Sequence, residues 1–513
     1  MIKYKGKTLT TEQEKHILTI IKSKNDYAIQ APPGSGKTFL LLALARKMSG
    51  YGLSISFNKL LAIEARSKFC KSVTCKTGHA LAYGSVGYKY KAKLRKLTGK
   101  YLADVEDIGD WQLYNSPANK GYLILNTIRK YCYSSDKIIS KRHLPKLTIL
   151  NDENIELMQE DLIRQSAKIF GKMTDLNNDL PVTHDVYLKV WALTDPIIRK
   201  DYIFFDEYQD SNPVIAQIIK NQDCQKIFVG DQFQQIYSWR GAVNALQDKS
   251  LDMLYITKSF RFGEAIADVA NKIITNYYPH DLDYISFHGN EEVESTISYN
   301  PKVPNCIICR TNKSVISETI KMLDKGYKVY ILGGTRPLTF LINSIHQLKI
   351  RGYSNHPELF LFSSYTDLKE YANSPMGGDL KPILKLIDTY SRERLLNILA
   401  STAENADKAD ITITTTHKAK GLEWPTVRLA NDFKCPTDDR VPSTEETNIL
   451  YVAASRALHC LDLSECDACN PEMMRRAYKL NKDKYLIEQE ISNKFDKVIK
   501  GNIKELQEDF FPF

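Results

Sequence analysis

The sequence predicts an α/β protein built around two parallel sheets that are flanked by helices. Short apolar runs, which are typical of buried strands, alternate with helical patterns over most of the 513 residues, and the alternation occurs in two series. A glycine-rich loop follows the first apolar run, and two acidic residues follow a later one. Because parallel strands present their carboxyl ends at one edge of a sheet, we expect both features at one ligand-binding edge.

The first series begins near the N-terminus and resumes after a long interruption. Strands are expected at 27–29, 53–57, 72–75, 202–205 and 226–230, and helices at 39–48 and 59–71. The interruption is mostly helical and basic at its start. We therefore expect a first domain over residues 1–84 and 196–253, with an inserted helical domain at 85–195.

The second series follows directly and carries its own insertion. Helices are expected at 266–274 and 448–457, and strands at 305–309, 328–332, 411–414, 426–430 and 460–463. The sequence shows no internal repeat of solenoid period. We predict a second domain over residues 254–334 and 406–470, a small inserted domain at 335–405 and a helical C-terminal extension at 471–513.

Composition and charge favour an intracellular protein with a polyanionic partner. The net charge is +9, and ten cysteines are scattered without the spacing of a disulfide framework. The sequence has no apolar run of about 18 residues, and its first residues do not resemble a signal peptide. We expect no membrane attachment and a reducing compartment, either the cytoplasm of a bacterial or phage-infected cell or the nucleus of a eukaryotic one.

The loop Ala31-Pro-Pro-Gly-Ser-Gly-Lys-Thr38 lies between a strand pattern and a helix pattern, which is the setting of a phosphate-binding loop. Backbone N–H groups around Gly34 and Gly36 can surround a pyrophosphate at the helix N-terminus. Lys37 can reach the β and γ phosphates, and the Thr38 hydroxyl can hold Mg²⁺. The alternative is a glycine turn that caps an ordinary helix. The predicted nucleotide contacts are Ala31, Pro32, Pro33, Gly34, Ser35, Gly36, Lys37 and Thr38.

Asp206 and Glu207 directly follow the expected strand at 202–205. Four apolar residues that end in two acids indicate a buried strand that delivers carboxylates to the ligand edge of the sheet. Asp206, with Thr38, would hold Mg²⁺, and Glu207 would orient or deprotonate an attacking water. The alternative role for such an acidic pair is helix N-capping. These residues predict hydrolysis of a nucleoside triphosphate.

Further motifs occur in a fixed order along the chain. They are Gln13 in Leu9-Thr-Thr-Glu-Gln13, the box Asp206-Glu-Tyr-Gln-Asp210, and segments 230–242, 415–423 and 445–457. In this order the motifs resemble the superfamily 1 DNA helicases of the UvrD/Rep type, over about residues 9–465. The resemblance implies two RecA-like P-loop domains in tandem, each with an inserted subdomain.

Three segments, 73–79, 182–185 and 234–245, look closest to the F-box DNA helicases. The F-box itself is not found in this sequence, which begins shortly before Gln13. A ubiquitin-ligase role is therefore not implied. The second insert looks smaller than in typical relatives, so autoinhibition and duplex grip, which depend on that insert, are not carried over.

The resemblance assigns further residues to an ATP site. Gln234 matches a γ-phosphate sensor, and Arg261 and Arg456 match two arginines that the second domain presents across a cleft. A planar guanidinium suits the phosphate oxygens of the transition state, and the arrangement implies that hydrolysis is coupled to domain closure. The remaining matches are the adenine-reading Gln13, the adenine-stacking Phe260, the ribose contact Glu423, and Phe39, which stands where many relatives have a base-stacking arginine.

The resemblance also implies a track for single-stranded DNA between the ATP motifs. Proteins bind such strands by stacking bases on aromatic side chains beside a cationic groove. For Trp239 the alternative is a core position, and for His79 and His417 it is structural hydrogen bonding. The matching residues are Phe57, Asn58, Thr77, His79, Tyr237, Trp239, Arg240, Arg310, Asn312, His417 and Lys418.

Two CxxC pairs have the spacing of metal ligands. Cys306 and Cys309 fall within an expected strand, where residues three apart point to opposite faces, so we do not expect both to bind one metal. The pair Cys466 and Cys469 leaves a structural zinc site open, with further ligands among Cys435, His459 and Cys460.

Together, the motifs predict an ATP-dependent DNA helicase that translocates on single-stranded DNA with 3′ to 5′ polarity, in replication, recombination or repair. We expect ATP and Mg²⁺ as cofactors, single-stranded DNA and its junctions with duplex as partners, replication or recombination proteins as further partners, and a monomer. The alternatives are a translocase that displaces proteins such as recombinase filaments, and a nonenzymatic DNA-binding scaffold. The scaffold is disfavoured by the intact set Lys37, Asp206, Glu207, Gln234, Arg261 and Arg456.

Overall fold

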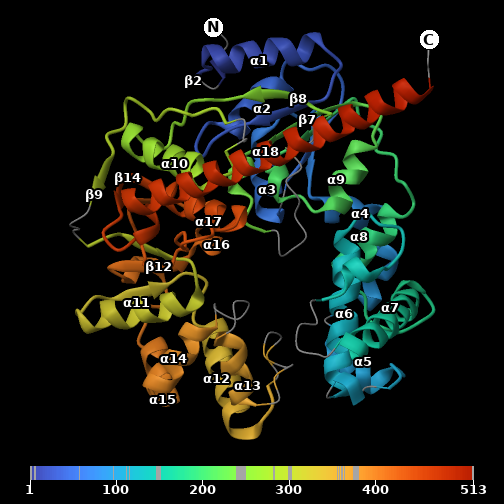
Figure 1. Cartoon of the computed structure of the whole chain (residues 1–513), viewed down its shortest axis with the longest axis vertical. Helices are drawn as coiled ribbons and strands as arrows, with labels where there is room; N and C mark the ends of the chain where they lie inside the picture. The colour runs from blue at the N-terminus through green and yellow to red at the C-terminus, as the bar shows by residue number, and fades with distance from the viewer. Residues whose placement is uncertain are drawn as a thin grey trace. The chain divides into compact units, whose positions relative to one another are not determined.

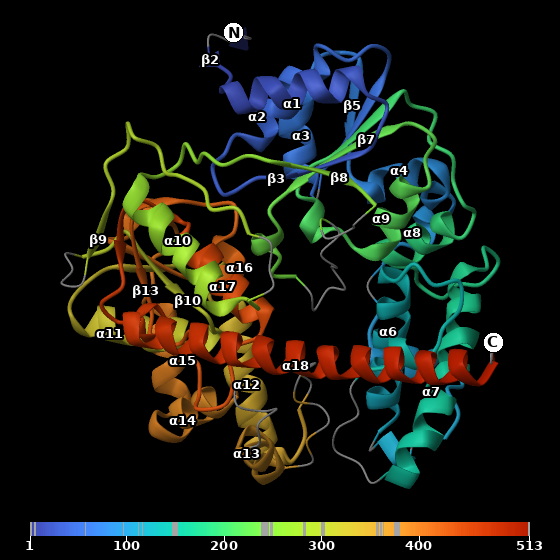
Figure 2. The ribbon, with the colours of Figure 1, turned by 45° about the horizontal axis from the view of Figure 1, so that its top comes forward.

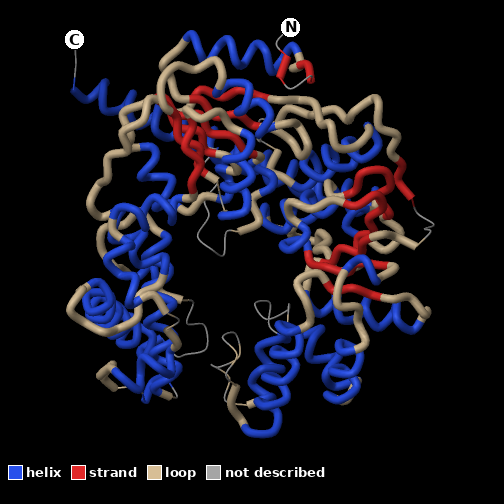
Figure 3. Tube along the Cα trace, turned by 180° about the vertical axis from the view of Figure 1, so that it is seen from behind, coloured by secondary structure: helices blue, strands red, loops and turns tan. Residues whose placement is uncertain are grey.

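The computed structural model forms two compact units, each with its own group of parallel strands (Figures 1 and 3). Unit 1 consists of Met1–Ile256 and Thr335–Leu399, and unit 2 of Thr257–Gly334 and Ala400–Phe513. The residues that the structure describes are 3–4, 7–56, 58–95, 97–110, 112–114, 116–145, 152–237, 246, 250–280, 284–298, 303–354, 356, 359, 362, 364–373 and 380–510.

Unit 1 is built on a six-stranded parallel sheet in the order β5-β4-β6-β7-β3-β8. Two short antiparallel strands, β1 (Lys3–Tyr4) and β2 (Lys7–Thr8), precede it. The expected strands of the first series are confirmed to within two residues. The strands are β3 (Tyr27–Gln30), β4 (Gly52–Ile55), β5 (Val73–Lys76), β6 (Tyr202–Phe205), β7 (Gln225–Gly230) and β8 (Asp252–Tyr255).

Strand β8 extends the first series beyond the expected boundary. We expected the second series to begin at Leu254, but Leu254 pairs with Ile29 of β3 in the first sheet. A short strand pattern does not show which sheet the strand joins, because that choice depends on pairing with a distant segment. The first sheet therefore continues to Tyr255.

The two faces of the first sheet carry separate apolar cores, because neighbouring residues of a strand point to opposite faces. Tyr202 and Phe204 of β6 pack in one core, while Ile203 and Phe205 pack in the other. Helices α1 (Thr11–Lys22), α2 (Lys37–Ala45) and α3 (Lys59–Lys68) contribute to the first core, and α9 (Pro213–Lys220) contributes to the second. Figure 2 shows α1, α2 and α3 beside these strands.

The insertion within the first series is helical, as expected, and packs on the sheet. Ile128 of the insert and Trp191 near its end lie in the same core as Ile203 of β6. The insert is therefore continuous with the core of unit 1. Helix α4 (Gly78–Ser85) leads into the insert. The helices of the insert are α5 (Gly99–Val105), α6 (Pro117–Tyr133), α7 (Asp152–Thr174) and α8 (His184–Ala192), with 3-10 turns η1 (Gly87–Lys93), η2 (Gln112–Tyr114) and η3 (Lys141–His143).

Unit 2 is built on a second six-stranded parallel sheet, in the order β11-β12-β10-β13-β14-β9. All five expected strands are present, and the expected α/β fold is confirmed. The edge strand β9 was not expected. The strands are β9 (Thr296–Ser298), β10 (Cys306–Cys309), β11 (Val329–Ile331), β12 (Ile411–Thr415), β13 (Trp424–Leu429) and β14 (Ala457–Asp462).

The helices of unit 2 include one that is buried on every side. Residues 447–454 of α17 (Thr444–Ala454) are all buried, as in a helix that passes through a core. The expected helix at 448–457 ends earlier, because Ala457 already begins β14. The other helices are α10 (Glu264–Tyr277), which packs on α17 and α18, α11 (Asn312–Asp324), α16 (Thr416–Ala419) and α18 (Pro471–Phe510).

The described residues between β11 and β12 include four α-helices. We expected an insert of the second domain here, and the chain does leave and re-enter the second sheet at neighbouring strands. The contacts of Thr335–Leu399 nevertheless group it with unit 1. The helices are α12 (Arg336–Arg351), α13 (Tyr365–Asn373), α14 (Lys381–Thr389) and α15 (Arg392–Ala400). None of the helices in the described ranges is long and apolar enough to span a membrane.

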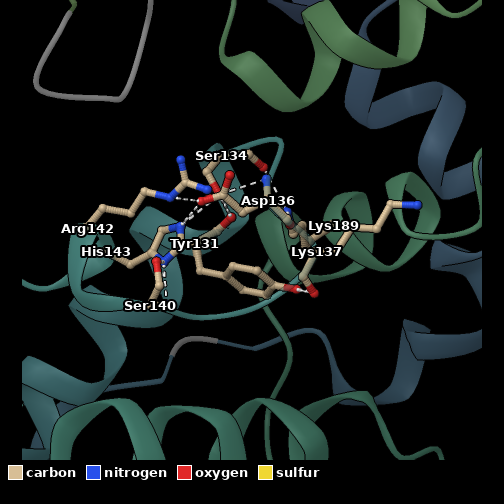
Figure 4. A network of polar contacts seen from close by, with 8 residues as sticks. All are labelled: Tyr131, Ser134, Asp136, Lys137, Ser140, Arg142, His143 and Lys189. Carbon is tan, nitrogen blue, oxygen red and sulfur yellow. Dashed lines mark hydrogen bonds and ion pairs between the residues drawn. The ribbon is translucent and has the colours of Figure 1, made fainter. Parts of the chain in front are cut away.

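A buried lysine joins α8 to the turn after α6 (Figure 4). Lys189 is 1% exposed, and its Nζ donates to the carbonyl oxygen of Ser134 at 2.8 Å and to that of Asp136. The ammonium also lies 4.2 Å from the centre of the Tyr131 ring. Burial lowers the pKa of Lys189 to about 8. These contacts fasten the end of α6 to α8.

His143 occupies the other side of the same network (Figure 4). Its Nδ1 accepts the backbone N–H of Ser140 at 2.9 Å, and its Nε2 lies 2.8 Å from Oδ2 of Asp136. Arg142 pairs with the same Asp136 carboxylate. Because Nδ1 is an acceptor, the arrangement favours a neutral ring with its proton on Nε2. Burial, as the largest effect, lowers the pKa of His143.

We predict that His143 makes the protein less stable in mild acid. Because the pKa of His143 is lower in the fold than its ordinary value of 6.5, the unfolded chain binds more protons as the pH falls through that value. The stabilising contribution is complete above pH 6.5 and is lost below it. Urea unfolding at pH 7.5 and 5.5 should show a larger loss of unfolding free energy in the wild type than in His143→Gln, which does not titrate. Equal losses in both proteins would contradict this prediction.

Candidate nucleotide site and nucleic-acid interface

The glycine-rich loop connects β3 to α2, as the sequence predicts. Gly34 and Gly36 have φ angles of +71° and +78°, in the left-handed region that side chains with a Cβ rarely adopt. Gly36 is also the N-cap of α2. The loop therefore wraps around a helix N-terminus, where the helix dipole favours an anion. The other predicted loop contacts, Ala31, Pro32, Pro33 and Ser35, are buried.

Lys37 and Thr38 begin α2 beside the end of β6. Nζ of Lys37 donates to the carbonyl oxygens of Ala31 and Pro32 at 3.0 and 3.2 Å, which holds the ammonium over the loop. Oγ1 of Thr38 donates to Oδ2 of Asp206 at 3.1 Å. The structure thus brings together the residues predicted to bind phosphate and metal, although 168 positions separate Thr38 from Asp206.

Thr38 and Asp206 fit a divalent cation. Burial, followed by the charge of Glu207, raises the pKa of Asp206 to about 6 although Lys37 acts in the opposite direction, so a cation bound here would stabilise the ionised carboxylate. Hydroxyl and carboxylate oxygens are ligands that Mg²⁺ prefers, and Mg²⁺ commonly takes its remaining ligands from water and phosphate.

No group of three or more His, Cys, Asp and Glu side chains in the described part of the chain is placed to hold a metal. A magnesium site with few protein ligands is compatible with this result. A zinc site at Cys466 and Cys469 gains no support from it. Both thiols are buried and free of disulfides.

Glu207 adopts a strained backbone conformation beside Asp206. Its φ of +54° and ψ of +44° are unusual for a residue with a side chain, and such strain persists where surrounding contacts hold it. The buried Gln209 makes one such contact, because its Nε2 donates to Oε2 of Glu207 at 2.5 Å. Oε1 of Gln209 accepts the N–H of Asp231 at 3.1 Å. Gln209 therefore links the end of β6 to the segment after β7.

The predicted phosphate sensor Gln234 lies in the 3-10 turn η5 (Gln232–Gln234), just after β7. Its Nε2 donates to Oδ2 of Asp231 at 2.8 Å. Oδ1 of the same Asp231 accepts from Nε2 of Gln30 at 2.8 Å. Since Gln30 is the last residue of β3, Asp231 ties the sensor segment to the strand that leads into the phosphate loop.

Gln13 joins α1 to the phosphate loop. Its Nε2 donates to the carbonyl oxygen of Ser35 at 3.2 Å, and its Oε1 accepts the N–H of Thr10 at 3.1 Å. The predicted adenine reader thus lies beside the loop, with its side-chain amide engaged in protein contacts. The predicted contact Phe39 is half-buried in the first turn of α2. Adenine recognition by Gln13 stays a prediction.

Unit 2 brings together Arg261, Glu423 and Arg456. Nε of Arg261 lies 2.8 Å from Oε2 of Glu423, and its Nη1 donates to the carbonyl oxygen of Ser455 at 3.2 Å. Nη2 of Arg456 donates to Oγ of Ser455 at 2.9 Å. Ser455 therefore contacts both arginines, a role that sequence reasoning missed although Ser455 lies within the motif that ends at Arg456.

Phe260 precedes Arg261 and is 42% exposed, unlike most large apolar side chains. An exposed ring is suited to stacking on a planar base. Arg456 is only 1% exposed, and its Nε also donates to the carbonyl oxygen of Val452 at 2.9 Å. The contacts of these residues with a nucleotide stay predictions.

Two predicted DNA contacts of unit 1 have clear structural roles. Asn58 is the N-cap of α3, and its Oδ1 accepts the N–H of Leu61 at 2.9 Å. Thr77 is the N-cap of α4, and its Oγ1 accepts the N–H of Ala80 at 3.1 Å. Capping explains these residue types without DNA. A second role in DNA binding stays a prediction.

His79 lies on α4 and contacts segment 182–185, one of the three segments that look closest to the F-box DNA helicases. Its Nε2 lies 3.0 Å from Oδ1 of Asp185 in the first turn of α8. Tyr237 is half-buried after β7. The predicted contacts Phe57, Trp239 and Arg240 lie outside the described residues.

The predicted DNA contacts of unit 2 gather at the carboxyl edge of its sheet. Arg310 and Asn312 follow β10, while His417 and Lys418 follow β12, the neighbouring strand. Because the strands are parallel, the two segments emerge at the same edge. Burial lowers the pKa of Lys418.

Two acidic residues hold the side chains and backbone at this edge in place, and sequence reasoning missed both. Nε and Nη2 of Arg310 each donate to a carboxylate oxygen of Glu446 on α17. Asp432, which follows β13, accepts the N–H groups of Arg310 and Thr311 at 2.8 Å each. Glu446 lies in the sixth motif and could have been noticed there. Asp432 has no comparable signal in the sequence.

We predict that Gln209→Leu destabilises unit 1, because the variant loses two hydrogen bonds of a buried amide, one accepted from the Asp231 N–H and one donated to Glu207. Loss of such buried partners costs about 1–3 kcal/mol. Urea unfolding measures the change. Gln217→Leu is the matched control, since Gln217 is exposed on α9 and its side chain donates to Asn221 on the surface, and a surface change of this kind costs under about 0.5 kcal/mol. Equal stability of the two variants would refute the bridging role of Gln209.

Comparison with known proteins identifies two family models in this chain. The UvrD/REP helicase N-terminal domain matches residues 151–251, which include β6, Asp206, Glu207 and Gln234. The UvrD-like helicase C-terminal domain matches residues 358–468, which include Glu423 and Arg456. The two models thus cover carboxylates in unit 1 and an arginine in unit 2.

Curated relatives match over most of this chain. The F-box DNA helicase 1 of Gallus gallus is 32% identical over 89% of the chain and 49% of its own length. The F-box DNA helicase protein 1 of Schizosaccharomyces pombe is 30% identical over 90% of the chain and 58% of its own length. The chain therefore spans about half the length of these relatives.

Among solved structures, an arterivirus nonstructural protein 10 (helicase) in complex with DNA covers 90% of this chain and 65% of its own, with 12% identity and a TM-score of 0.34. That likeness is too low to support an argument. The family models and the F-box DNA helicase relatives support the motif resemblance independently of it. The chain thus matches the family models of both the N-terminal and the C-terminal domain of UvrD/Rep-type helicases, in agreement with the motif resemblance.

Proposed function

We propose that this protein is an ATP-dependent DNA helicase that translocates on single-stranded DNA. The observation that carries the proposal is the meeting of Lys37, Thr38, Asp206 and Glu207 at one edge of the first sheet. The F-box DNA helicase relatives support DNA as the substrate. We further propose 3′ to 5′ polarity, unwinding at junctions of single-stranded and duplex DNA, and a role in replication, recombination or repair. In this proposal the protein acts as a monomer inside the cell, with replication or recombination proteins as partners.

Residues of unit 1 perform the phosphate chemistry in this proposal. Lys37 neutralises the β and γ phosphates, and Thr38 and Asp206 hold Mg²⁺, which supplies further charge neutralisation. Glu207 orients the attacking water and accepts its proton. Gln209 holds the Glu207 carboxylate, so the base is oriented by a neutral amide that adds no charge.

Residues of unit 2 complete the ATP site. Arg261 and Arg456 place guanidinium groups at the γ-phosphate, where they stabilise the charge of the transition state. Ser455 sets the spacing between them, because it contacts both. Since the two sets of residues belong to different units, efficient hydrolysis in this proposal needs both units, and this requirement couples ATP hydrolysis to movement along DNA.

We predict that Lys37→Ala and Glu207→Gln each lower the kcat of DNA-stimulated ATP hydrolysis by about 10²-fold or more, because each removes a charge or a base that acts in the transition state. Lys47→Ala is the matched control, since Lys47 is exposed just past the far end of α2. Hydrolysis that survives Lys37→Ala would overturn the assigned site.

The same protein should unwind a duplex with a 3′ single-stranded tail and leave one with a 5′ tail intact. Unwinding of the 5′-tailed substrate alone would refute the polarity. Hydrolysis without unwinding, together with displacement of a recombinase filament, would instead identify a translocase that strips proteins. DNA binding without hydrolysis would identify a scaffold.

Arg261→Lys is predicted to lower kcat more than it raises the KM for ATP. Lysine keeps the charge but loses the planar, multiply donating group that contacts Ser455 and Glu423. We expect kcat to fall at least about tenfold, a loss of about 1.4 kcal/mol. Arg475→Lys, an exposed position on α18, is the control. An unchanged kcat would exclude Arg261 from the reaction.

A further inference from the structure

Helix α8 brings an unassigned segment of the insert against α4, which carries the predicted DNA contact His79. The segment 182–185 stood out in the sequence, but the proposed function gives it no role. Helices α4 and α8 pack together, as Figures 1 and 2 show. Oδ1 of Asp185 lies 3.0 Å from Nε2 of His79, across 106 positions of the chain. Contact between these two residues is therefore a product of the fold.

A buried tyrosine organises the side chains around this contact. The Tyr187 ring packs edge-on against His79, His184 and Tyr83, with ring centres 6.5, 5.6 and 5.9 Å apart. Its hydroxyl lies 3.1 Å from Nδ1 of His184 and 3.5 Å from the carbonyl oxygen of His79. Tyr187 is buried, whereas His184 is exposed and Tyr83 is half-buried. The rings of His79, His184 and Tyr83, which are at least partly exposed and can contact a base, are thus arranged around the buried ring of Tyr187, which cannot.

We do not expect Asp185 to contact DNA directly, because a carboxylate repels phosphate. Its side chain and that of His79 are 26% and 37% exposed, so the pair lies at the surface. The carboxylate accepts from Nε2, which fixes the plane of the imidazole and leaves Nδ1 directed away from Asp185. A ring fixed in this way can stack on a base without losing rotational freedom on binding.

We infer that the first turn of α8 and α4 form one contact surface for single-stranded DNA, in which Asp185 is a positioning residue that acts through His79, and His184 is a further contact. This inference rests on the proposed function. It extends the DNA track from the first series onto the helical insert. The alternative is that Asp185 only ties α8 to α4.

A double-mutant cycle distinguishes a positioning role of Asp185 in DNA binding from a purely structural role. We would measure the affinity of the full chain for a fluorescent oligothymidine by anisotropy at fixed salt, for His79→Ala, Asp185→Ala and the double variant. We expect each single variant to weaken binding by about fivefold or more, which is the lower range for loss of one stacked base. The double variant should bind no more weakly than His79→Ala, because Asp185 acts through that ring.

Conservative and control variants sharpen the test. Asp185→Asn keeps an acceptor oxygen for Nε2, so its affinity should stay within about twofold of wild type. His184→Ala should weaken binding by about threefold or more. Asp104→Ala, an exposed acid on α5 of the same insert, should change nothing. In ATPase assays, the DNA concentration for half-maximal stimulation should rise in Asp185→Ala while kcat at saturating DNA stays unchanged.

Several results would overturn the inference. Additive losses from His79→Ala and Asp185→Ala would show that Asp185 does not act through His79. Unchanged affinity in Asp185→Ala and His184→Ala, with a loss in His79→Ala, would confine the DNA contact to α4. Unchanged affinity in all three variants, with normal DNA-stimulated hydrolysis, would remove DNA from this surface while leaving the proposed function intact. A wild type without DNA binding would refute the function itself.

Discussion

Parallel strand pairing is the constraint on which the candidate site depends. Strand β7 lies between β6 and β3 and pairs with both, so the residues after all three strands emerge at one edge of the first sheet. The bond from Thr38 to Asp206 closes this arrangement across 168 positions. The second sheet obeys the same rule, because β10 and β12 are neighbours and deliver Arg310 and Lys418 to one edge.

Neutral amides hold the charged groups of the first edge in place. Gln209 bridges Glu207 to Asp231, and Gln30 bridges β3 to the same Asp231. An amide both donates and accepts, so it can join two groups without adding to the negative charge of Glu207, which, after burial, is the second cause of the raised pKa of Asp206. The carboxylates are therefore ordered by the fold itself, which is the condition for electrostatic preorganisation. In unit 2, Ser455 and Glu446 serve a similar purpose for three arginines.

The sequence predicted the site where residues with a specific chemical role directly follow a recognisable strand or turn pattern. The run at 202–205 is apolar on both faces because β6 is buried in a parallel sheet, and the two acids after it had few alternative explanations. The phosphate loop was recognisable because its positive φ angles at Gly34 and Gly36 favour glycine, which leaves a visible pattern in the sequence. The placement of β8 was not readable, since its four residues look like a strand of either sheet.

Residues that act through tertiary contact also escaped prediction. Ser455 meets Arg261 across 194 positions, and Asp432 meets Arg310 across 122. No local pattern encodes such pairs, because each depends on how distant strands and helices pack. The early end of α17 has a similar origin, because an apolar run without Gly or Pro does not show where a helix becomes a strand.

The central claim is that Lys37 and Glu207 in unit 1 and Arg261 and Arg456 in unit 2 act on one nucleotide. A structure determined with ADP, aluminium fluoride, Mg²⁺ and a single-stranded oligonucleotide tests it most directly. The account predicts Mg²⁺ bound by Thr38 and Asp206, and both guanidinium groups within hydrogen-bonding distance of the fluoride or phosphate groups. A nucleotide held by unit 1, with both arginines still bound only to Ser455 and its neighbours, would contradict it.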